Sequence, residues 1–443
     1  MKLIKTLYFT KRLFILLGAS AVVFVLSFFF PILNAPAAFL FLAVAAFLLL
    51  DVAMLFSGRR RIIASRSIPP RLSNGDENPT CVRLRNNYPY AVNITLTDEL
   101  PIQLQERDFS RSSRLRSGKG KEVIYHIRPF ERGLYQFGRI NVFVKGLLGL
   151  AERRFIFSQE QEVPVYPSFL QMRRYEMLAF SSRVFDTGIR RLRRSGNTME
   201  FEQIKEYVAG DDIRTINRNA TARAAKLMVN QYQDERSRSV YCIIDKGRAM
   251  KMPFEKMTLL DYAINATLAI SNIVLKKDDK AGLITFDHQI ESMVTAERKG
   301  ATLQKVMHNL YNLQTSFTEP DFPLLYTHIS RKINQRSLML LFTNFESLSS
   351  LRRQLPYLRK LALNHLLVVI FFENTELKAL AEQKASDTGA IYVKTIAEKL
   401  NFEKKLIRKE LEIFGIASVL TTPQELTLST INKYMEVKAR NML

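Results

Sequence analysis

The chain opens with two long apolar segments that are separated by a short uncharged turn. Residues 13–30 carry no charge, and residues 37–56 are interrupted only by Asp51. At ~1.5 Å of rise per helical residue, each segment spans, or nearly spans, a hydrocarbon core of ~30 Å. We therefore predict a membrane hairpin with two transmembrane helices, at about 13–33 and 36–56.

Basic residues flank this hairpin on both sides. Lys11 and Arg12 precede the first span, and Arg59 is the first of three arginines after the second. Positively charged flanks stay on the cytoplasmic side, so we expect everything after residue 57 in the cytoplasm. A cleaved signal peptide is the alternative for the first span, but the apolar region is too long and a second span follows at once. Asp51 lies close enough to the cytoplasmic end to reach the headgroups.

Short alternating runs replace the long apolar segments after about residue 67. Residues 91–100 and 133–145 alternate apolar and polar positions, and turn-forming stretches such as SNGDENP and SGKGK separate such runs. Many short strands at this spacing indicate an antiparallel β-sandwich. The basic residues within 111–121 form one solvated loop, which either only keeps the protein soluble or contacts acidic lipid or a partner.

From about residue 240 onward, strand-type and helix-type segments alternate. This order predicts a doubly wound α/β domain, with helices on both faces of a parallel sheet. Residues 290–295 follow the preceding strand after two residues, which suits an antiparallel edge hairpin. The predicted strands are 240–245, 281–287, 338–343, 365–372 and 390–393, and the predicted helices are 254–276, 302–313, 348–363, 376–388, 397–414 and 424–441.

The pattern divides the chain into four parts. The predicted parts are a membrane hairpin (1–62), a β-sandwich (66–168), a linking segment (169–238) and an α/β domain (239–443).

The charge points to an anionic partner. The net charge is +23, which suits nucleic acid, an acidic protein or the cytoplasmic leaflet of a membrane. Residues 190–194 read RRLRR, but no recognised DNA- or RNA-binding module accompanies them, so an exposed linker is favoured over nucleic-acid recognition. Two cysteines far apart give neither a disulfide framework nor a zinc spacing. No GxGxxG follows a strand, and we expect no nucleotide cofactor.

Residues 196–235, GNTMEFEQIKEYVAGDDIRTINRNATARAAKLMVNQYQDE, resemble the signature of bacterial proteins that carry domain of unknown function 58. One departure is that Asn217 and Arg218 stand where the family usually has Trp, and the chain has no Trp. The stretches RGLYQFG and GLLGLAERRF and the hairpin extend the resemblance to nearly the whole chain. The matching residues are Gly196, Glu200, Phe201, Tyr207, Gly210, Asp211, Arg214, Ile216, Thr221, Ala222 and Arg223.

This resemblance implies a von Willebrand factor A-like fold for the α/β domain. It also implies an AAA+ ATPase of the MoxR type as partner, in the assembly or maturation of other complexes. The charged and aromatic signature residues form either a buried ion-pair network or a surface that faces the partner. The residues in question are Glu200, Tyr207, Gly210, Asp211, Arg214 and Arg223.

Asp245 ends the first strand of the α/β domain, where ligand sites of such sheets lie. The resemblance implies a Mg²⁺ site built from Asp-x-Ser-x-Ser, a distant Thr and a later Asp. Gly247 and Ala249 occupy the serine places without a side-chain oxygen, Thr302 holds the threonine place, and Asn344 replaces the second acid. Divalent affinity falls with ligand charge, so we predict a degenerate site without tight metal binding.

The sequence lacks the other local catalytic motifs, and only a Ser-His-Asp triad, which is set by space and not by sequence, stays open. An aspartyl-phosphate site needs a second acid two residues after Asp245, where Gly247 stands, and neither HExxH nor GxSxG occurs. We therefore expect a non-enzymatic, membrane-anchored interaction protein without a cofactor, with the ATPase and membrane lipids as partners. The alternative is a divalent-metal hydrolase centred on Asp245. A third hypothesis is a protein that binds nucleic acid or anionic lipid.

Overall fold

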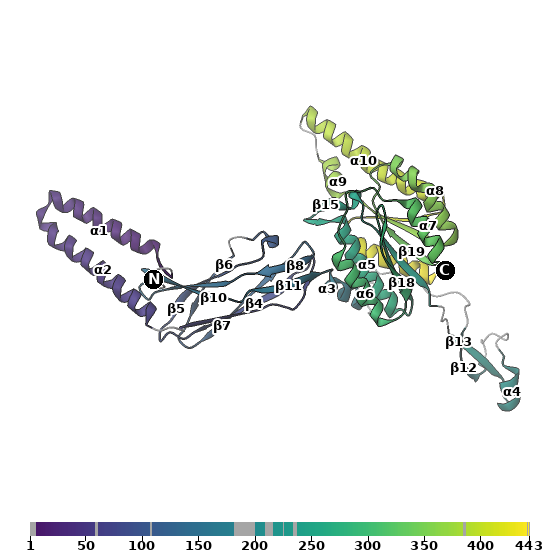
Figure 1. The fold of residues 1–443 in the computed structure, drawn as a ribbon, viewed down its shortest axis with the longest axis horizontal. Coiled ribbons are helices and arrows are strands. Elements are labelled where there is room, and N and C mark those ends of the chain that lie inside the picture. Colours follow the sequence, from purple (N-terminus) through teal and green to yellow (C-terminus); the bar gives the residue numbers. More distant parts are fainter. Residues whose placement is uncertain are drawn as a thin grey trace. The chain divides into compact units, whose positions relative to one another are not determined.

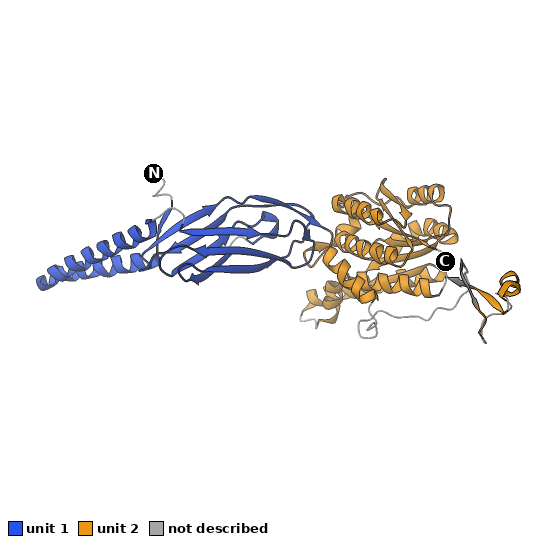
Figure 2. Ribbon diagram, turned by 90° about the horizontal axis from the view of Figure 1, so that it is seen from below, with its two compact units in different colours: residues 1–166 blue, residues 167–443 orange. Residues whose placement is uncertain are grey.

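The chain forms two compact units, residues 1–166 and 167–443 (Figures 1 and 2). The computed structural model describes residues 6–57, 61–106, 109–180, 200–208, 216–224, 226–233, 237–383, 387–440 and 442.

Unit 1 begins with the two apolar helices. Helix α1 spans Lys11–Phe29, and α2 spans Asn34–Phe56 after the 3-10 turn η1, Pro31–Leu33. Both helices are long and apolar enough to cross a membrane. Most of their side chains are exposed, so these helices bury little apolar surface within the protein itself.

The rest of unit 1 is β-rich and mainly antiparallel, as the alternating pattern predicts. Three sheets have the strand orders β1-β10-β9-β5-β6, β2-β4-β7 and β3-β11-β8. Alternate residues of their strands enter one apolar core, as Val82 and Leu84 of β4 do. The strands are β1 Leu7–Phe9, β2 Ile62–Ser67, β3 Leu72–Ser73, β4 Asn78–Asn86, β5 Val92–Asp98, β6 Ser110–Leu115, β7 Gly120–Ile127, β8 Gly133–Phe137, β9 Ile140–Lys145, β10 Ala151–Phe157 and β11 Gln161–Tyr166.

Asp51 departs from the sequence-based expectation that its carboxylate reaches the headgroups. The structure buries it completely against the β9–β10 turn. Its carboxylate accepts hydrogen bonds from the backbone N–H groups of Leu148, Leu150 and Ala151, at 3.0, 2.9 and 3.1 Å. The charge is thus satisfied by three donors, and it ties the end of α2 to the β sheets.

Unit 2 is built on a six-stranded mixed sheet with the order β18-β17-β14-β19-β20-β21 (Figure 1). Strand β18 runs antiparallel to β17, as the short link predicts, and the other neighbours are parallel. The strands are β14 Ser239–Asp245, β17 Lys280–Phe286, β18 Ile290–Glu297, β19 Leu338–Phe342, β20 Leu366–Phe372 and β21 Ala417–Thr421.

Helices cover both faces of this sheet. Val240, Cys242 and Ile244 of β14 enter the core under α3, α5, α6 and α11, while Tyr241 and Ile243 enter the core under α7, α8 and α10. The helices are α3 Phe169–Phe180, α5 Leu259–Lys276, α6 Gly300–Asn312, α7 Phe322–Lys332, α8 Leu348–Asn364, α9 Thr375–Glu382, α10 Thr388–Ile413 and α11 Leu426–Ala439.

Three short elements and a small hairpin complete the described part of unit 2. A 3-10 turn η5 (Arg248–Lys251) and the short strands β15 (Pro253–Phe254) and β16 (Met257–Thr258) follow β14. Strands β12 (Glu200–Glu206) and β13 (Met228–Gln233) pair antiparallel, with helix α4 (Arg218–Ala224) between them.

The prediction of a strand at residues 390–393 is wrong, because this run lies inside α10. Asp387 caps the helix, and its carboxylate accepts the Ala390 N–H at 2.6 Å. The last strand of the sheet is β21, which the sequence reading missed. The apolar run at 390–393 is therefore helical and not extended, because the Asp387 cap starts a helix here and the apolar face further along α10 is buried.

Candidate functional site

Asp245 lies at the carboxyl edge of the sheet, as predicted. In the parallel register, Asp245 is paired with Phe286 of β17, and Ile244 is paired with Phe342 of β19. The residues that follow these strands, Asp287 and Thr343, are therefore brought beside it. This is the edge at which ligands of open α/β sheets bind.

The Asp245 carboxylate is buried and has protein donors on both oxygens. The Thr343 hydroxyl donates to one oxygen at 2.7 Å, and the Gly247 N–H donates to the other at 2.7 Å. Burial raises the pKa of Asp245 to about 6, and the neighbouring Asp287 carboxylate adds to this rise in spite of the two hydrogen bonds.

The space around Gly247 leaves no room for a side chain. A Cβ at this position would lie 2.9 Å from Pro320 Cδ and 3.1 Å from the Thr318 carbonyl oxygen. A serine at the first serine place of a metal loop therefore does not fit without a shift of the facing loop. Ala249, at the second serine place, lies in η5 and carries no side-chain oxygen.

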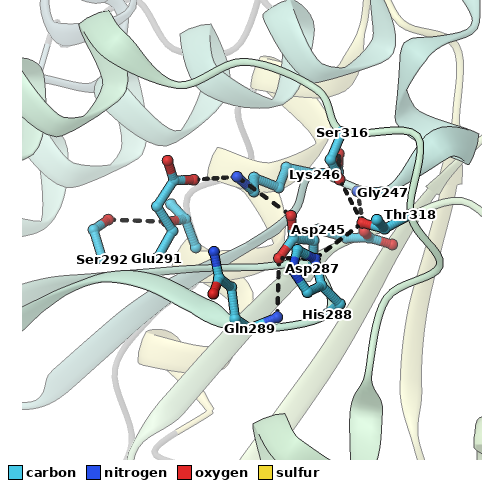
Figure 3. A network of polar contacts seen from close by, with 11 residues as sticks. Asp245, Lys246, Gly247, Asp287, His288, Gln289, Glu291, Ser292, Ser316 and Thr318 are labelled. Atoms are coloured by element: carbon cyan, nitrogen blue, oxygen red, sulfur yellow. Dashed lines mark hydrogen bonds and ion pairs between the residues drawn. The ribbon is translucent and has the colours of Figure 1, made fainter.

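A lysine and a second carboxylate occupy the space beside Asp245 (Figure 3). The Lys246 Nζ lies 2.5 Å from a Glu291 oxygen and 3.3 Å from an Asp287 oxygen. Asp287 also accepts the Gln289 N–H at 2.9 Å and lies 3.1 Å from the His288 Nδ1. The positive charge beside these carboxylates is thus supplied by the Lys246 side chain.

The two carboxylates have opposite pKa shifts. Burial would raise the pKa of Asp287, but the Gln289 N–H, the Ser316 hydroxyl and Lys246 together lower it. Burial would likewise lower the pKa of Lys246, but Glu291 and Asp287 raise it. At neutral pH the pair is a hydrogen-bonded salt bridge, whereas among the described residues Asp245 has no cationic partner of its own.

The loop between α6 and α7, residues 313–321, completes the edge and was missed by the sequence reading. The Ser316 N–H donates to the Lys246 carbonyl at 2.9 Å, and the Arg248 N–H donates to the Thr318 carbonyl at 3.1 Å. The one signal in the sequence was an aromatic residue, Phe317, within a polar connection between two helices.

Thr302, predicted at the threonine place, lies at the other edge of the sheet. Strand β18 runs away from the carboxyl edge and ends with Glu297 paired to Ala281, near the start of β17. Helix α6 begins three residues later, so Thr302 in its first turn is at the amino edge. The structure therefore does not bring Thr302 to Asp245.

Asn344 lies at the carboxyl edge, but its side-chain oxygen is engaged. It accepts a hydrogen bond from Lys404 Nζ of α10 at 2.6 Å, and the same ammonium donates to the Phe345 carbonyl at 2.5 Å. Burial lowers the pKa of Lys404 to about 8. A cavity of about 180 Å³ adjoins this lysine, with a mainly apolar lining that includes Met252, Phe254, Phe372, Leu377 and Leu400.

These residues do not fit a divalent ion. Mg²⁺ requires near-octahedral oxygen ligation, usually with one or two carboxylates. Asp245 is bonded to Thr343 and Gly247, Asn344 is held by Lys404, and the Lys246 ammonium stands beside Asp287. A bound metal would have to break these contacts.

The signature residues fall in and around the β12–β13 hairpin. Glu200 begins β12, Tyr207 follows it with its N–H bonded to the Leu227 carbonyl at 2.8 Å, and Arg223 is exposed on α4. Gly210, Asp211, Arg214 and the basic stretch 190–194 lie outside the described residues.

Asn217, at the usual tryptophan place, supports the same hairpin. Its side-chain oxygen accepts the Ala220 N–H at 3.0 Å at the start of α4, and its amide donates to Asn230 of β13 at 2.9 Å. Asn217 thus caps the start of α4 and links it to β13.

Residues 203–394 match the family model described as "Protein of unknown function DUF58". This part of the chain is similar to the DUF58 family. The matched range begins within β12 and includes β13, Asp245, Asp287 and Thr343, so the carboxyl edge described above, apart from Lys404, lies within it.

An "Uncharacterized protein YeaD" of Bacillus subtilis is 26% identical over 259 residues, which are 55% of this chain. The match spans 61% of that relative's length. Among solved structures, the ASH/PapD-like domain of human CEP192 is 16% identical, with a TM-score of 0.18, over 24% of this chain and 83% of its own. A CARDB domain from Pyrococcus furiosus is 14% identical, with a TM-score of 0.17, over 24% of this chain and 86% of its own.

Proposed function

We propose that this protein is a membrane-anchored, cytoplasm-facing interaction protein that docks a protein partner on the carboxyl edge of its α/β sheet without a metal bridge. The sheet, with its antiparallel edge strand β18 and an aspartate at the end of its first strand, supports a von Willebrand factor A-like fold. The resemblance to the DUF58 family supports an AAA+ ATPase of the MoxR type as the partner, in the assembly or maturation of other complexes.

The anchoring part rests on how the hairpin joins unit 1. Strand β1 lies just before α1 and pairs with β10, and the Tyr88 hydroxyl donates to the Leu55 carbonyl at the end of α2 at 2.8 Å. Both ends of the hairpin are therefore held by the same β unit. Since a hairpin with both ends on one side is a two-span anchor, its basic flanks favour the cytoplasm for that side.

The observation that carries the docking proposal is an exposed aromatic residue at the carboxyl edge. Phe317, in the loop 313–321, is 77% exposed, and the Lys251 Nζ lies 3.7 Å from the centre of its ring. Close by, Arg248 lies 3.4 Å from Glu319 and 3.5 Å from Glu346. An aromatic anchor within a ring of charged and polar groups is typical of protein interfaces.

The test is co-purification of the ATPase with the full-length protein from detergent-solubilised membranes, with and without chelator. Phe317→Ser is expected to weaken the complex at least about tenfold, because truncation of an aromatic anchor costs ~2 kcal/mol or more. The matched control is Leu363→Ser, which changes an apolar residue that is 83% exposed at the end of α8, at the amino edge.

Equal losses in both variants, or none in either, would refute docking at this edge. Binding that requires Mg²⁺ would refute the metal-free version and favour the hydrolase hypothesis centred on Asp245. Release of the wild-type protein from membranes by alkaline carbonate would refute the anchor.

A further inference from the structure

A groove of about 800 Å³ opens in unit 1 beside the start of α1. Four cations from three separate segments line it, together with hydroxyl-bearing and amide side chains. Two of the cations precede the apolar stretch of α1, one is on β6, and one is on β9. They are Lys11, Arg12, Arg114 and Lys145.

The sheet register explains why two of these cations converge. Asn93 of β5 is paired with Arg114 on one side and with Lys145 on the other. Directly opposed residues on neighbouring strands point to the same face, so the three side chains form a row across the sheet. The Thr95 and Ser112 hydroxyls, 3.1 Å apart, lie two positions along on this face.

The positive charge of the groove is only slightly compensated. Lys145 lies 3.3 Å from Glu152, the one acidic side chain of the lining. Within the described part of the chain, Lys11, Arg12 and Arg114 form no ion pair. Two of the four cations are arginines, whose planar guanidinium groups bind phosphate oxygens in pairs.

The groove lies at the depth at which a membrane-spanning α1 meets the headgroups. The polar layer on each side of a bilayer is ~5–7 Å thick, and Lys11 is the first residue of the helix. The β9–β10 turn forms one wall and exposes Leu147 and Leu148, of which 56% and 43% are accessible. The carboxylate of Asp51 on α2 accepts hydrogen bonds from backbone N–H groups of this turn. These hydrogen bonds hold the two leucines next to α2.

We propose that this groove binds the phosphate headgroup of an anionic phospholipid, with Leu147 and Leu148 in contact with the acyl chains. The inference rests on the proposed membrane anchor and adds a specific lipid site to it. Fixed cations at the membrane surface favour anionic over zwitterionic lipid, and the adjacent apolar turn favours a lipid over a free phosphate or a nucleic-acid backbone.

The test is native mass spectrometry of the full-length protein in mild detergent, titrated with phosphatidylglycerol or phosphatidylcholine of the same acyl chains. We expect the wild type to retain phosphatidylglycerol preferentially. Each cation contributes about fivefold near an anionic surface, so the variant K11Q/R12Q/R114Q/K145Q is expected to lose on the order of a hundredfold or more in affinity. The control K299Q/K305Q/R331Q/R353Q makes the same charge change at exposed positions of unit 2 and is expected to behave as wild type.

Arg114→Gln alone tests the groove in case the fourfold variant does not fold, since it changes one exposed residue on β6. We expect about a fivefold loss for this variant and near-complete rescue by Arg114→Lys.

Equal retention of the two lipids by the wild type, or unchanged phosphatidylglycerol binding in both groove variants, would overturn the lipid site. So would full displacement of lipid by millimolar inorganic phosphate or by a short DNA oligonucleotide. Carbonate extraction separates the two proposals: groove variants that stay in the membrane while losing phosphatidylglycerol support both. Release of the wild type would overturn the anchor and the lipid site with it.

Discussion

Asp245→Asn is expected to stabilise unit 2 at neutral pH. Burial raises the pKa of Asp245 from 3.8 to about 6, which means that ionisation of this carboxylate opposes folding. The difference between the two pKa values lowers the free energy of unfolding by about 3 kcal/mol at neutral pH. Asparagine keeps the geometry, because its oxygen accepts the Gly247 N–H and its amide donates to the Thr343 hydroxyl. The charge and its repulsion by Asp287 are removed.

The sign of the pH dependence follows from the direction of the shift. Because the folded state holds the Asp245 proton more tightly than the unfolded state, the wild type loses stability as the pH rises from 3.8 through about 6. The advantage of Asp245→Asn is therefore expected to be about 1 kcal/mol at pH 4.5 and about 3 kcal/mol at pH 7.5.

The assay is calorimetry of the full-length protein in detergent at pH 4.5 and 7.5, with and without Mg²⁺. A gain of about 3 kcal/mol is expected to raise the melting temperature of unit 2 by at least about 5 °C. A variant that is less stable than the wild type at pH 7.5 would refute the reasoning. So would a Mg²⁺-dependent rise in melting temperature that the wild type shows and the variant lacks.

Three further changes test the remaining contacts. Gly247→Ser is expected to cost about 1–3 kcal/mol through contact with Pro320 and Thr318 and to confer no Mg²⁺-dependent shift in melting temperature, which calorimetry checks. Lys404→Met removes a lysine whose pKa is lowered by burial from 10.5 to about 8. The wild type is therefore expected to gain about 3 kcal/mol of stability relative to this variant as the pH rises from 8 to 10.5. An equal difference in melting temperature between the two proteins at both pH values would contradict this. Asp51→Asn replaces one of the two carboxylate oxygens that accept hydrogen bonds from the β9–β10 turn by a donor. Limited proteolysis is therefore expected to cut this turn faster, while carbonate extraction stays unchanged. An unaltered cleavage rate would contradict the role of Asp51.

The elements of this protein were largely readable from local patterns. Uncharged runs marked α1 and α2, alternation marked the antiparallel strands, and the two-residue link marked the edge strand β18. Each of these signals lies within one continuous segment of the chain. The local patterns failed at β21, which was missed, and at the predicted strand 390–393, where a helix cap and a long amphipathic face outweighed a short apolar run.

The site was harder to predict from the sequence, because its residues come from distant segments. Asp245 was identified from its place at a strand end, but Thr302 was assigned by order along the chain, and the direction of β18 sends it to the other edge. Lys404 is 60 residues from its partner Asn344, and no spacing rule connects them. The loop 313–321 contacts Lys246 through the backbone N–H and the hydroxyl of Ser316, and both donate to the Lys246 carbonyl, an acceptor that does not depend on the residue type at 246.

The two carboxylates of the carboxyl edge provide an internal test of how this edge is used. Burial acts on both in the same direction, yet the pKa of Asp245 is raised and that of Asp287 is lowered. The pKa of Asp287 is lowered by the Gln289 N–H, by the Ser316 hydroxyl and by the Lys246 ammonium, which lies 3.3 Å away. Asp287→Asn is therefore expected to destabilise unit 2 at pH 7.5, opposite in sign to Asp245→Asn, because it removes the carboxylate that Lys246 stabilises.

A metal site predicts a different pair of results. If a divalent cation were the intended counter-charge of this edge, loss of either carboxylate would weaken binding and both variants would lose Mg²⁺-dependent stability. Opposite signs in the two variants, unaffected by Mg²⁺, would instead mean that the positive charge of this edge is supplied by the chain. An edge already neutralised in this way presents its loop and the Phe317 ring to a partner without first requiring an ion.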